Sequence, residues 1–205
     1  MELVKAMENP LSHPKIFNLF LSVVGGGSRS FTTLVREYIR PDNYMSILDL
    51  CCGTSNILPY LEYSEYIGID LNVKNTEHCR KKYADKRNVH FINGDINPFL
   101  RSNEKQFDII LFLSGMHHFC DADLISCLRN VQRVLKPEGR LITIDGCLES
   151  DLPLIAKLML KNDRGKYVRI KDAWIEIVSS VMPDIKFSIR RDLNKIPYNH
   201  IIFYT

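Results

Sequence analysis

The chain has 205 residues, a formal net charge of +3, and 45% hydrophobic and 25% charged residues. This composition is typical of one globular domain with its own hydrophobic core. The weak positive charge argues against a nucleic-acid-binding protein, because such proteins carry a stronger basic patch. No apolar run reaches the roughly 20 residues that cross a bilayer, and no signal-peptide pattern opens the chain. We therefore expect a cytoplasmic protein that binds neither nucleic acid nor a membrane.

The cysteines indicate reduced thiols, and we expect no metal site. None of the six cysteines forms a C-x-x-C pair, which fits a protein of a reducing compartment. The segment from His117 to Cys120 (HHFC) contains metal-binding residue types. No second ligand pair stands at the spacing that a zinc site requires.

Two helical segments are expected before the first strand. Residues 12–24 are almost wholly apolar, three glycines follow at 25–27, and helical spacing of apolar residues resumes over 29–39. Glycine is costly inside a helix, so the glycines predict a break between the two helices.

Strand-like runs then alternate with helix-length segments. The runs are short, rich in apolar residues and bounded by turn residues, which is typical of parallel strands buried on both faces. The clearest helix has an apolar stripe at helical spacing over residues 121–135. Strands that alternate with helices predict βαβ units and a parallel sheet. The expected strands cover residues 46–50, 66–70, 89–95, 107–114 and 139–146.

The C-terminal part departs from this alternation. Residues 147–175 interrupt the strand pattern and carry an excess of basic residues. Two further strand-like runs, 184–193 and 198–205, are separated by the short link NKIP. A link of this length favours an antiparallel hairpin, which we place at the edge of the sheet.

The turn after the first strand has the features of a ligand cradle. The strand SILDL carries Asp49 near its end and enters a turn of small residues, where backbone amides can approach a ligand closely. The second strand ends at Asp70, at the spacing from which a carboxylate binds ribose hydroxyls. The third strand run ends at Asp95. We interpret the three carboxylates as a nucleoside site, although acidic strand ends also occur in α/β folds without a nucleoside.

The same turn favours S-adenosylmethionine over a dinucleotide. A dinucleotide fold has the pattern G-x-G-x-x-G, whereas residues 51–56 contain one glycine. Asp49 would repel a pyrophosphate and attract an ammonium group. A ligand with adenosine at one end and an amino acid at the other fits both observations.

Five motifs resemble, in order and spacing, those of class I S-adenosylmethionine-dependent methyltransferases. The closest likeness is to the small single-domain type related to ubiquinone/menaquinone-biosynthesis methyltransferases. The family pattern D-x-G-x-G-x-G is altered, because Cys51 and Ser55 replace its outer glycines. The motifs are ILDLCCGTSNILPYL, YIGIDLN, INGDI, FDIILFLSGMHHF and LKPEGRLITID.

The resemblance implies an α/β, Rossmann-like class I methyltransferase fold. Its central sheet is expected to be mostly parallel and seven-stranded, with an antiparallel last strand and helices on both faces. We expect a single domain, divided into an N-terminal helical lid (1–45), a cofactor-binding core (46–146), a helical insertion (147–183) and a closing β-hairpin (184–205).

The resemblance also implies roles for individual residues around S-adenosylmethionine and its product S-adenosylhomocysteine. Asp49 would face the methionine amine, the Cys51 carbonyl would accept from it, and Gly53 would line the methionine chain. A cation from the N-terminal region, Arg29 or alternatively Lys15, would bind the cofactor carboxylate. The residues expected at the ribose, the adenine and the sulfonium are Asp70, Leu71, Asp95, Ile96, Leu113 and Ser114.

Three residues are candidates for catalysis. His117 and His118 follow the fourth strand, and Asp145 ends the fifth. Imidazole titrates near neutral pH, so His117 suits a general base, and Asp145 would orient it or accept the proton. The alternative, which is stronger for His118, is that a histidine caps the next helix or packs against the cofactor.

The basic C-terminal segment is the expected acceptor site. We assign Arg164, Lys166, Tyr198 and His200 to acceptor binding, since basic residues would receive an anionic glycan or secondary-metabolite precursor. The alternative is a solvated helix face and ordinary edge-strand residues.

We expect methyl transfer to a small-molecule acceptor, at an oxygen, by a monomer or homodimer. One rival interpretation is a catalytically silent S-adenosylmethionine-binding subunit of a partner enzyme. Two others are an NAD-dependent oxidoreductase and an RNA methyltransferase, and the modest charge disfavours the latter.

Overall fold

The computed structural model describes residues 27–149, 152–154, 156–157, 165–195 and 199–205. The expected helix over 12–24 and the predicted site residues Arg164 and Tyr198 lie outside this part of the chain, as does Lys15.

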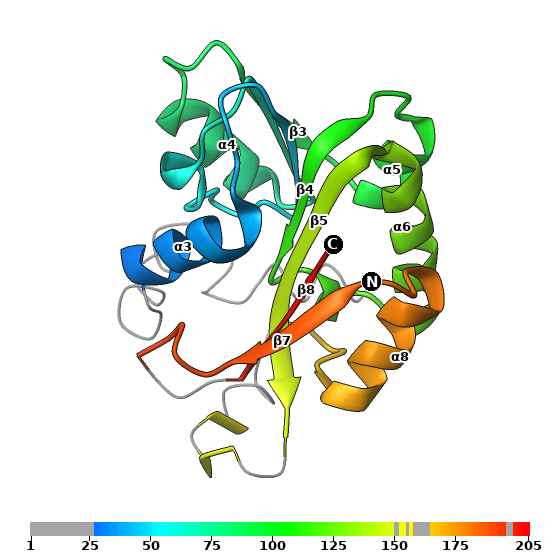
Figure 1. The fold of residues 1–205 in the computed structure, drawn as a ribbon. Helices are drawn as coiled ribbons and strands as arrows, with labels where there is room; N and C mark the ends of the chain where they lie inside the picture. Colours follow the sequence, from blue (N-terminus) through cyan, green and yellow to red (C-terminus); the bar gives the residue numbers. More distant parts are fainter. Residues whose placement is uncertain (1–26, 150–151, 155, 158–164, 196–198) are drawn as a thin grey trace.

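A single sheet forms the centre of the molecule (Figure 1). Its strand order is β3-β2-β1-β4-β5-β8-β7, and the two-residue strand β6 pairs with β5 alone. Strand β8 runs antiparallel to both β5 and β7, while the pairs among β1 to β5 are parallel. The prediction of a mostly parallel sheet with an antiparallel last strand is therefore confirmed. The strands are β1 (Ser46–Leu50), β2 (Glu65–Asp70), β3 (Val89–Asn93), β4 (Phe107–Leu113), β5 (Leu135–Leu148), β6 (Arg169–Ile170), β7 (Lys186–Arg190) and β8 (His200–Tyr204).

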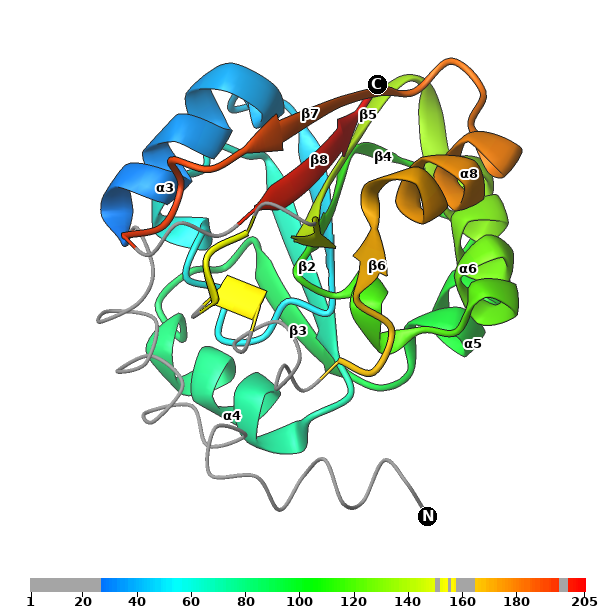
Figure 2. The same cartoon turned by 90° about the horizontal axis from the view of Figure 1, so that it is seen from below.

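Helices cover both faces of the sheet, as Figures 1 and 2 show. Helices α3 and α4 lie on one face, and α5, α6 and α8 lie on the other. The helices are α3 (Ser28–Leu34), continued by the π-helical turn η2 (Val35–Ile39), α4 (Val73–Lys82), α5 (Ile96–Ser102), α6 (Asp121–Val134) and α8 (Lys171–Val181), with the 3₁₀ turns η3 (Leu58–Tyr60) and η4 (Met116–His118).

Strand β5 begins earlier than the sequence predicted. It starts at Leu135, which pairs with Phe107, whereas the next pair joins Arg140 to Ile109. Three extra residues of β5 are thus absorbed between these pairs, around Pro137, which has no amide hydrogen for the ladder. The residues around Pro137 therefore form a bulge inside β5, whereas the sequence predicted a link between the helix and the strand at this point.

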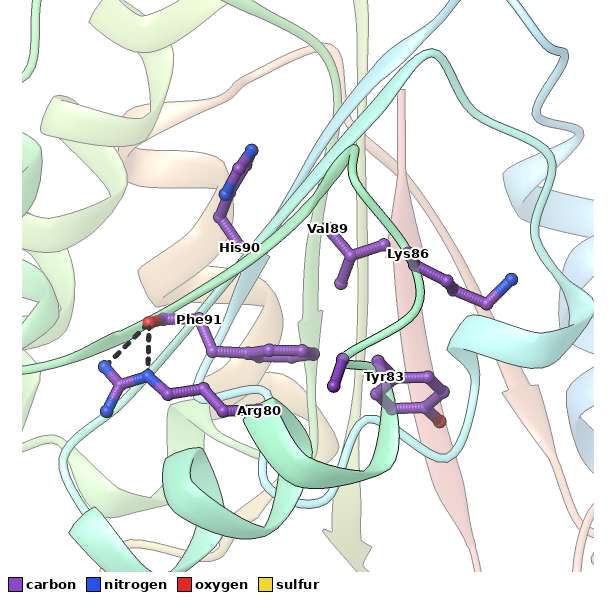
Figure 3. A pocket seen from close by; sticks show the side chains of 7 residues that line it. Arg80, Tyr83, Lys86, Val89, His90 and Phe91 are labelled. Atoms are coloured by element: carbon purple, nitrogen blue, oxygen red, sulfur yellow. Dashed lines mark hydrogen bonds between the residues drawn. The ribbon is translucent and has the colours of Figure 1, made fainter.

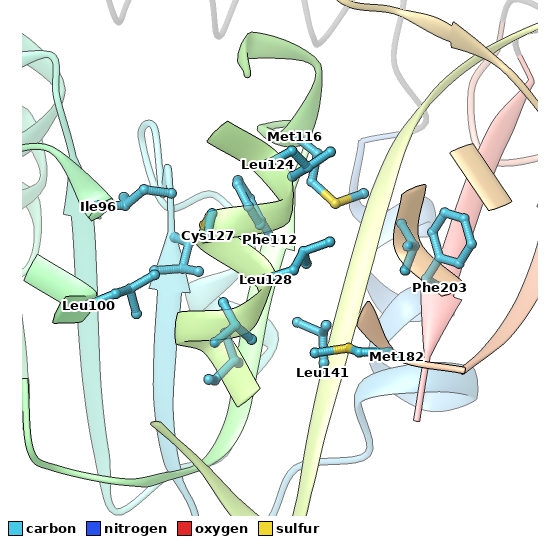
Figure 4. Packing of buried hydrophobic residues seen from close by; sticks show 14 of the residues in the cluster. Ile96, Leu100, Phe112, Met116, Leu124, Cys127, Leu128, Leu141, Met182 and Phe203 are labelled. Carbon is cyan, nitrogen blue, oxygen red and sulfur yellow. The ribbon is translucent and has the colours of Figure 1, made fainter. Parts of the chain in front are cut away.

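Two apolar clusters, one on each face, hold the layers together. The larger cluster packs α5, α6 and α8 against the sheet (Figure 4). The predicted apolar stripe of α6 is buried in it, and each such side chain contributes about 1.5–3 kcal/mol relative to an exposed one. The buried stripe residues of α6 are Leu124, Cys127, Leu128, Val131 and Val134. Leu135, which was also expected in the stripe, begins β5 and is only partly buried.

The parallel strands bring their carboxyl ends to one edge of the sheet, which Figure 2 views from below. In α/β folds ligands bind at this edge, at the point where the strand order reverses. Here the order reverses between β1 and β4. In the described part of the chain, no helix has both the length and the apolar character that crossing a membrane requires.

Candidate functional site

The turn after β1 has positive φ angles at three alternate positions, two of which are not glycine. Cys51, Gly53 and Ser55 all have positive φ angles, of 55°, 53° and 46°. This region costs a non-glycine residue about 1–2 kcal/mol. The altered motif positions at Cys51 and Ser55 therefore change the side chain and preserve the shape of the turn.

Glycines on neighbouring segments make room for the two cysteines of the turn. A Cβ at Gly115 would lie 2.9 Å from the Cβ of Cys51. A Cβ at Gly68, on β2, would lie 2.9 Å from the Sγ of Cys52. Both distances are shorter than an ordinary van der Waals contact. The side chains of Cys51 and Cys52 therefore fit only because Gly115 and Gly68 have no side chain.

Asp70 joins the turn to the end of β2. Its Oδ2 accepts from the Gly53 amide at 2.8 Å, and its Oδ1 accepts from the Asn72 amide at 2.8 Å and the Asn75 side chain at 3.2 Å. Its side chain is almost fully buried, while the adjacent Leu71 is 52% exposed. Asp70 therefore fixes the cradle as well as standing at the predicted ribose position.

Asp49 lies beneath the turn and is only 2% exposed. Its Oδ2 accepts from the hydroxyl of Tyr66 at 2.5 Å, and the same hydroxyl contacts the Ser55 Oγ at 3.2 Å. Burial raises the pKa of Asp49 to about 7; the Tyr66 hydrogen bond opposes this, and the charge of Asp70 adds to it. The carboxyl group of Asp49 therefore changes its charge near neutral pH.

Asp95 is exposed and stands beside the end of β2. Its side chain caps α5 by accepting from the Asn97 amide at 2.8 Å. The Gly94 amide donates to the Asp70 carbonyl at 3.1 Å, which brings the ends of β2 and β3 together. The next residue, Ile96, is buried in the larger apolar cluster.

The end of β4 carries Leu113 and Ser114. Ser114 has a φ of 57° and donates its amide to the Ile144 carbonyl at 2.7 Å. This hydrogen bond joins the residue that follows β4 to Ile144 of β5, which directly precedes Asp145. The two predicted sulfonium positions therefore lie at the same edge as the residues described below.

His117 and Asp145 form a buried pair. The Nδ1 atom of His117 is hydrogen-bonded to the Asp145 carboxylate. The same carboxylate accepts from the amides of Met116 at 3.2 Å and His117 at 3.3 Å. His117 is 5% exposed and Asp145 is fully buried. His118 is exposed, with its ring centroid 4.4 Å from that of His117.

The insertion reaches this pair. Gly165 lies against the imidazole, since an added Cβ there would overlap the ring of His117. The Tyr167 amide donates to the His117 carbonyl at 3.0 Å. Lys166, which lies between Gly165 and Tyr167 in the sequence, is exposed. His200 pairs in register with Gly146, the residue after Asp145. The structure thus places the backbone of Lys166 next to residues that contact His117. His200 lies beside the end of β5, but it pairs with Gly146, so its side chain projects to the other face of the sheet from that of Asp145.

Arg29 lies in the first turn of α3 and is exposed. Its helix contacts the β7–β8 connection, because the Ser30 hydroxyl donates to the Leu193 carbonyl. There Arg190, and to a smaller extent Arg29, hold the pKa of Asp192 at about 2. The charge of Arg29 thus acts on Asp192 in this connection, and its role toward the cofactor stays a prediction.

Sequence reasoning missed two residues of the site. Tyr66 is an ordinary strand residue in the sequence, and its bond to Asp49 depends on the pairing of β1 with β2. Gly165 belongs to a segment interpreted only for its charges. Across the described residues, no three histidine, cysteine or acidic side chains gather closely enough to hold a metal ion.

A surface hollow of about 280 Å³ lies elsewhere, between the end of α4 and the first residues of β3 (Figure 3). The Arg80 guanidinium donates to the Phe91 carbonyl at 2.8 and 3.1 Å. The hollow lies near the amino end of β3, so it is separate from the candidate site. Its lining residues are Arg80, Tyr83, Ala84, Lys86, Val89, His90 and Phe91.

Comparison with known proteins agrees with this geometry. The family described as "Methyltransferase domain" matches residues 47–139. A demethylmenaquinone methyltransferase of Staphylococcus saprophyticus is 30% identical over 173 residues, covering 75% of this chain and 70% of the relative. One of Leptospira interrogans is 32% identical over 120 residues, covering 55% of this chain and 47% of the relative. This chain thus spans about half the length of several curated relatives.

The fold is shared with a solved structure. A SAM-dependent methyltransferase from Archaeoglobus fulgidus superposes with a TM-score of 0.68 at 16% identity, over 92% of this chain and 99% of that chain. Sheet order, motif order and similarity to the curated relatives agree. The chain belongs to the class I S-adenosylmethionine-dependent methyltransferases, in the group related to menaquinone biosynthesis.

Proposed function

We propose that this protein transfers a methyl group from S-adenosylmethionine to a small-molecule acceptor, with His117 as general base and Asp145 as its orienting partner. The observation that carries this proposal is the buried His117–Asp145 pair at the same sheet edge as the cradle around Asp70. A histidine held by a carboxylate is the usual arrangement for removing a proton near neutral pH.

The cradle fits the cofactor of the family. Among the residues that the structure describes, none has an atom within 4 Å of an ideal Cβ at Gly53 or Gly94, which supports close approach of a ligand to both glycines. Asp49 would bind the methionine ammonium, Asp70 the ribose, and Asp95 the adenine. We extend the proposal to the other predicted contacts: the Cys51 carbonyl, Leu71, Ile96, Leu113, Ser114 and, for the carboxylate, Arg29. When bound, S-adenosylmethionine supplies an electrophilic methyl group on a positively charged sulfur.

The chain's own residues supply alignment and a base. Nδ1 of His117 is engaged by Asp145, so Nε2 is the nitrogen that would take the proton of an acceptor hydroxyl. The Asp145 carboxylate, fixed by two backbone amides, stabilises the imidazolium that results. The segment at Gly165 covers the ring and limits access of water.

The acceptor is proposed to be a small molecule with an acidic hydroxyl group. The curated relatives are named for demethylmenaquinone, and we take its reduced, hydroquinone form, which carries the hydroxyl groups that the proposed base needs, as the first acceptor to test. Lys166 lies in the chain between two residues that contact His117, which supports a role in acceptor binding, and for His200 the support is its backbone pairing with Gly146, next to Asp145. The predicted contacts Arg164 and Tyr198 belong to the same proposal.

The test measures transfer of a labelled methyl group from S-adenosylmethionine to demethylmenaquinone, supplied oxidised and reduced, and then to a panel of phenols. We expect His117→Ala and Asp145→Asn to lower kcat by roughly 100-fold or more, with unchanged affinity for S-adenosylhomocysteine. His90→Ala, an exposed histidine on β3, is the matched control. Full transfer by both site variants would refute the base. Cofactor binding without transfer to any acceptor would favour the catalytically silent subunit.

A further inference from the structure

A buried arginine lies near the proposed base His117 but is not part of the His117–Asp145 pair. Arg169 is the first residue of β6 and is 9% exposed. Burying a guanidinium is costly unless every side of it is paired. The contacts of Arg169 therefore show which segments of the chain its burial holds together.

One side of Arg169 holds the junction between η4 and α6. Its Nε and Nη2 donate to the Asp121 Oδ1 at 3.0 and 2.6 Å, and Nη2 also donates to the Phe119 carbonyl at 2.8 Å. Phe119 directly follows the turn that carries His117, and Asp121 begins α6 two residues later. The arginine thus fixes the chain two residues beyond the proposed base.

The other side of Arg169 is tied to the end of β5. The guanidinium carbon lies 4.7 Å from the centroid of the Trp174 ring, a cation–π distance. The Trp174 Nε1 donates to the Gly146 carbonyl at 3.0 Å, and Arg169 itself pairs with Cys147 in the β5–β6 ladder. Gly146 directly follows Asp145.

Arg169 also shapes the segment that covers the imidazole. Its Nη1 donates to the Tyr167 carbonyl at 2.8 Å, while the Tyr167 amide donates to the His117 carbonyl at 3.0 Å. Gly165, two residues earlier, lies against the His117 ring. Three separate connections therefore run from one guanidinium to the surroundings of His117 and Asp145.

We propose that Arg169 is a positioning residue, which holds His117 in register with Asp145 by binding both the η4–α6 junction and the segment around Tyr167. This proposal rests on the proposed function, since positioning matters only if His117 is the base. A catalytic group must stay within about 0.5 Å of its productive place, and a misplacement of about 1 Å can cost roughly 100-fold in rate. Lysine cannot reproduce the planar, multiply bonded and stacked arrangement.

The test compares Arg169→Lys with Asp121→Asn, in the full chain. Asp121 is largely exposed, so its variant is expected to fold and to weaken only the anchor of the arginine. Arg133→Lys is the matched control, because Arg133 also donates to backbone carbonyls but at the far end of α6.

The first readout is the NMR signal of the His117 Nδ1 proton, which is assigned by its loss in His117→Gln and needs neither cofactor nor acceptor. We expect Arg169→Lys to speed exchange of this proton with water by roughly tenfold or more, Asp121→Asn to do so less, and Arg133→Lys not at all. An unchanged exchange rate in both of the first two variants overturns the proposal.

The second readout is methyl transfer to demethylmenaquinone. We expect Arg169→Lys to lower kcat by roughly 10- to 100-fold with little change in KM and an unchanged affinity for S-adenosylhomocysteine. Loss of cofactor affinity in parallel with kcat would overturn the proposal in favour of a general structural role. If His117→Ala retained full transfer while the Nδ1 proton still responded to Arg169→Lys, the proposed base would fail and the structural link would remain.

Discussion

The charge of Asp49 is predicted to change near neutral pH, and this can be measured without any acceptor. In the unfolded chain the carboxyl ionises at its ordinary pKa of 3.8, whereas burial raises the pKa in the folded protein to about 7. Between these values the folded state holds a proton that the unfolded state has lost. The contribution of Asp49 to stability therefore falls as pH rises from about 4 to about 7, and is lowest above pH 7.

The size of this effect follows from the pKa difference. About three units at 1.36 kcal/mol each give about 4 kcal/mol in total. Between pH 5 and pH 8 the part that is lost amounts to about 3 kcal/mol. An Asp49→Asn variant has no such titration, so its free energy of unfolding relative to wild type should rise by this amount over the same interval. Urea unfolding of both ligand-free proteins at pH 5, 6, 7 and 8 measures this difference directly, because other titrations cancel.

Tyr66→Phe provides the matched second variant. The Tyr66 hydroxyl donates to Asp49 and favours its ionised form, so its removal should raise the pKa of Asp49 and move the stability change to higher pH. If the stability difference between Asp49→Asn and wild type stays flat within about 1 kcal/mol from pH 5 to pH 8, the assigned pKa is wrong.

The same titration tests the proposed contact between Asp49 and the methionine ammonium. A cation next to the carboxylate favours ionisation, so binding of S-adenosylhomocysteine should release close to one proton at pH 6 and almost none at pH 8. Calorimetry in phosphate and in Tris detects this proton through the different ionisation heats of the two buffers. Asp49→Asn should release none. A binding heat independent of the buffer at pH 6 would place the ammonium elsewhere.

Two further variants test the cradle and the segment that covers the base. Gly165→Ala places a methyl group where the His117 ring lies, so we expect roughly 100-fold slower transfer with unchanged cofactor affinity; an active variant would show that the segment does not contact the ring in solution. Asp70→Asn leaves one acceptor oxygen where the carboxylate offers one to the Gly53 amide and one to the Asn72 amide, and we expect roughly 10- to 100-fold weaker binding of S-adenosylhomocysteine by calorimetry.

The sheet was predictable from the sequence because its strands are buried on both faces and leave uninterrupted apolar runs. Residues 47–50 and 109–112 show this most clearly, since all but Asp49 are apolar and fully buried. Their order in the sheet was not predicted, because apolar runs alone do not show which strands are neighbours. The two-residue strand β6 was not predicted, because a pairing that short has no periodicity to detect.

The candidate site was predictable only in part. The strand ends located Asp70, Asp145 and His117, since parallel strands bring their carboxyl ends to one edge. The role of Arg169 was missed, because in the sequence it belongs to a run of basic residues that reads as a solvated or anion-binding surface. Its burial depends on Asp121, which is distant in the chain, so no local pattern could separate it from its exposed neighbour Lys166.

Cys51 replaces a motif glycine and brings a thiol to the turn that is proposed to bind the methyl donor. The charges around Cys51 decide whether this thiol is ionised. A thiolate beside a methyl donor would itself be methylated, because the thiolate and not the thiol is the nucleophile. Burial raises the pKa of the Cys51 thiol well above its ordinary value, and the nearby charges of Asp70, Asp49 and Asp145 raise it further. In the ligand-free protein, burial and the neighbouring carboxylates thus favour the protonated thiol, the less nucleophilic form, at this glycine position of the motif.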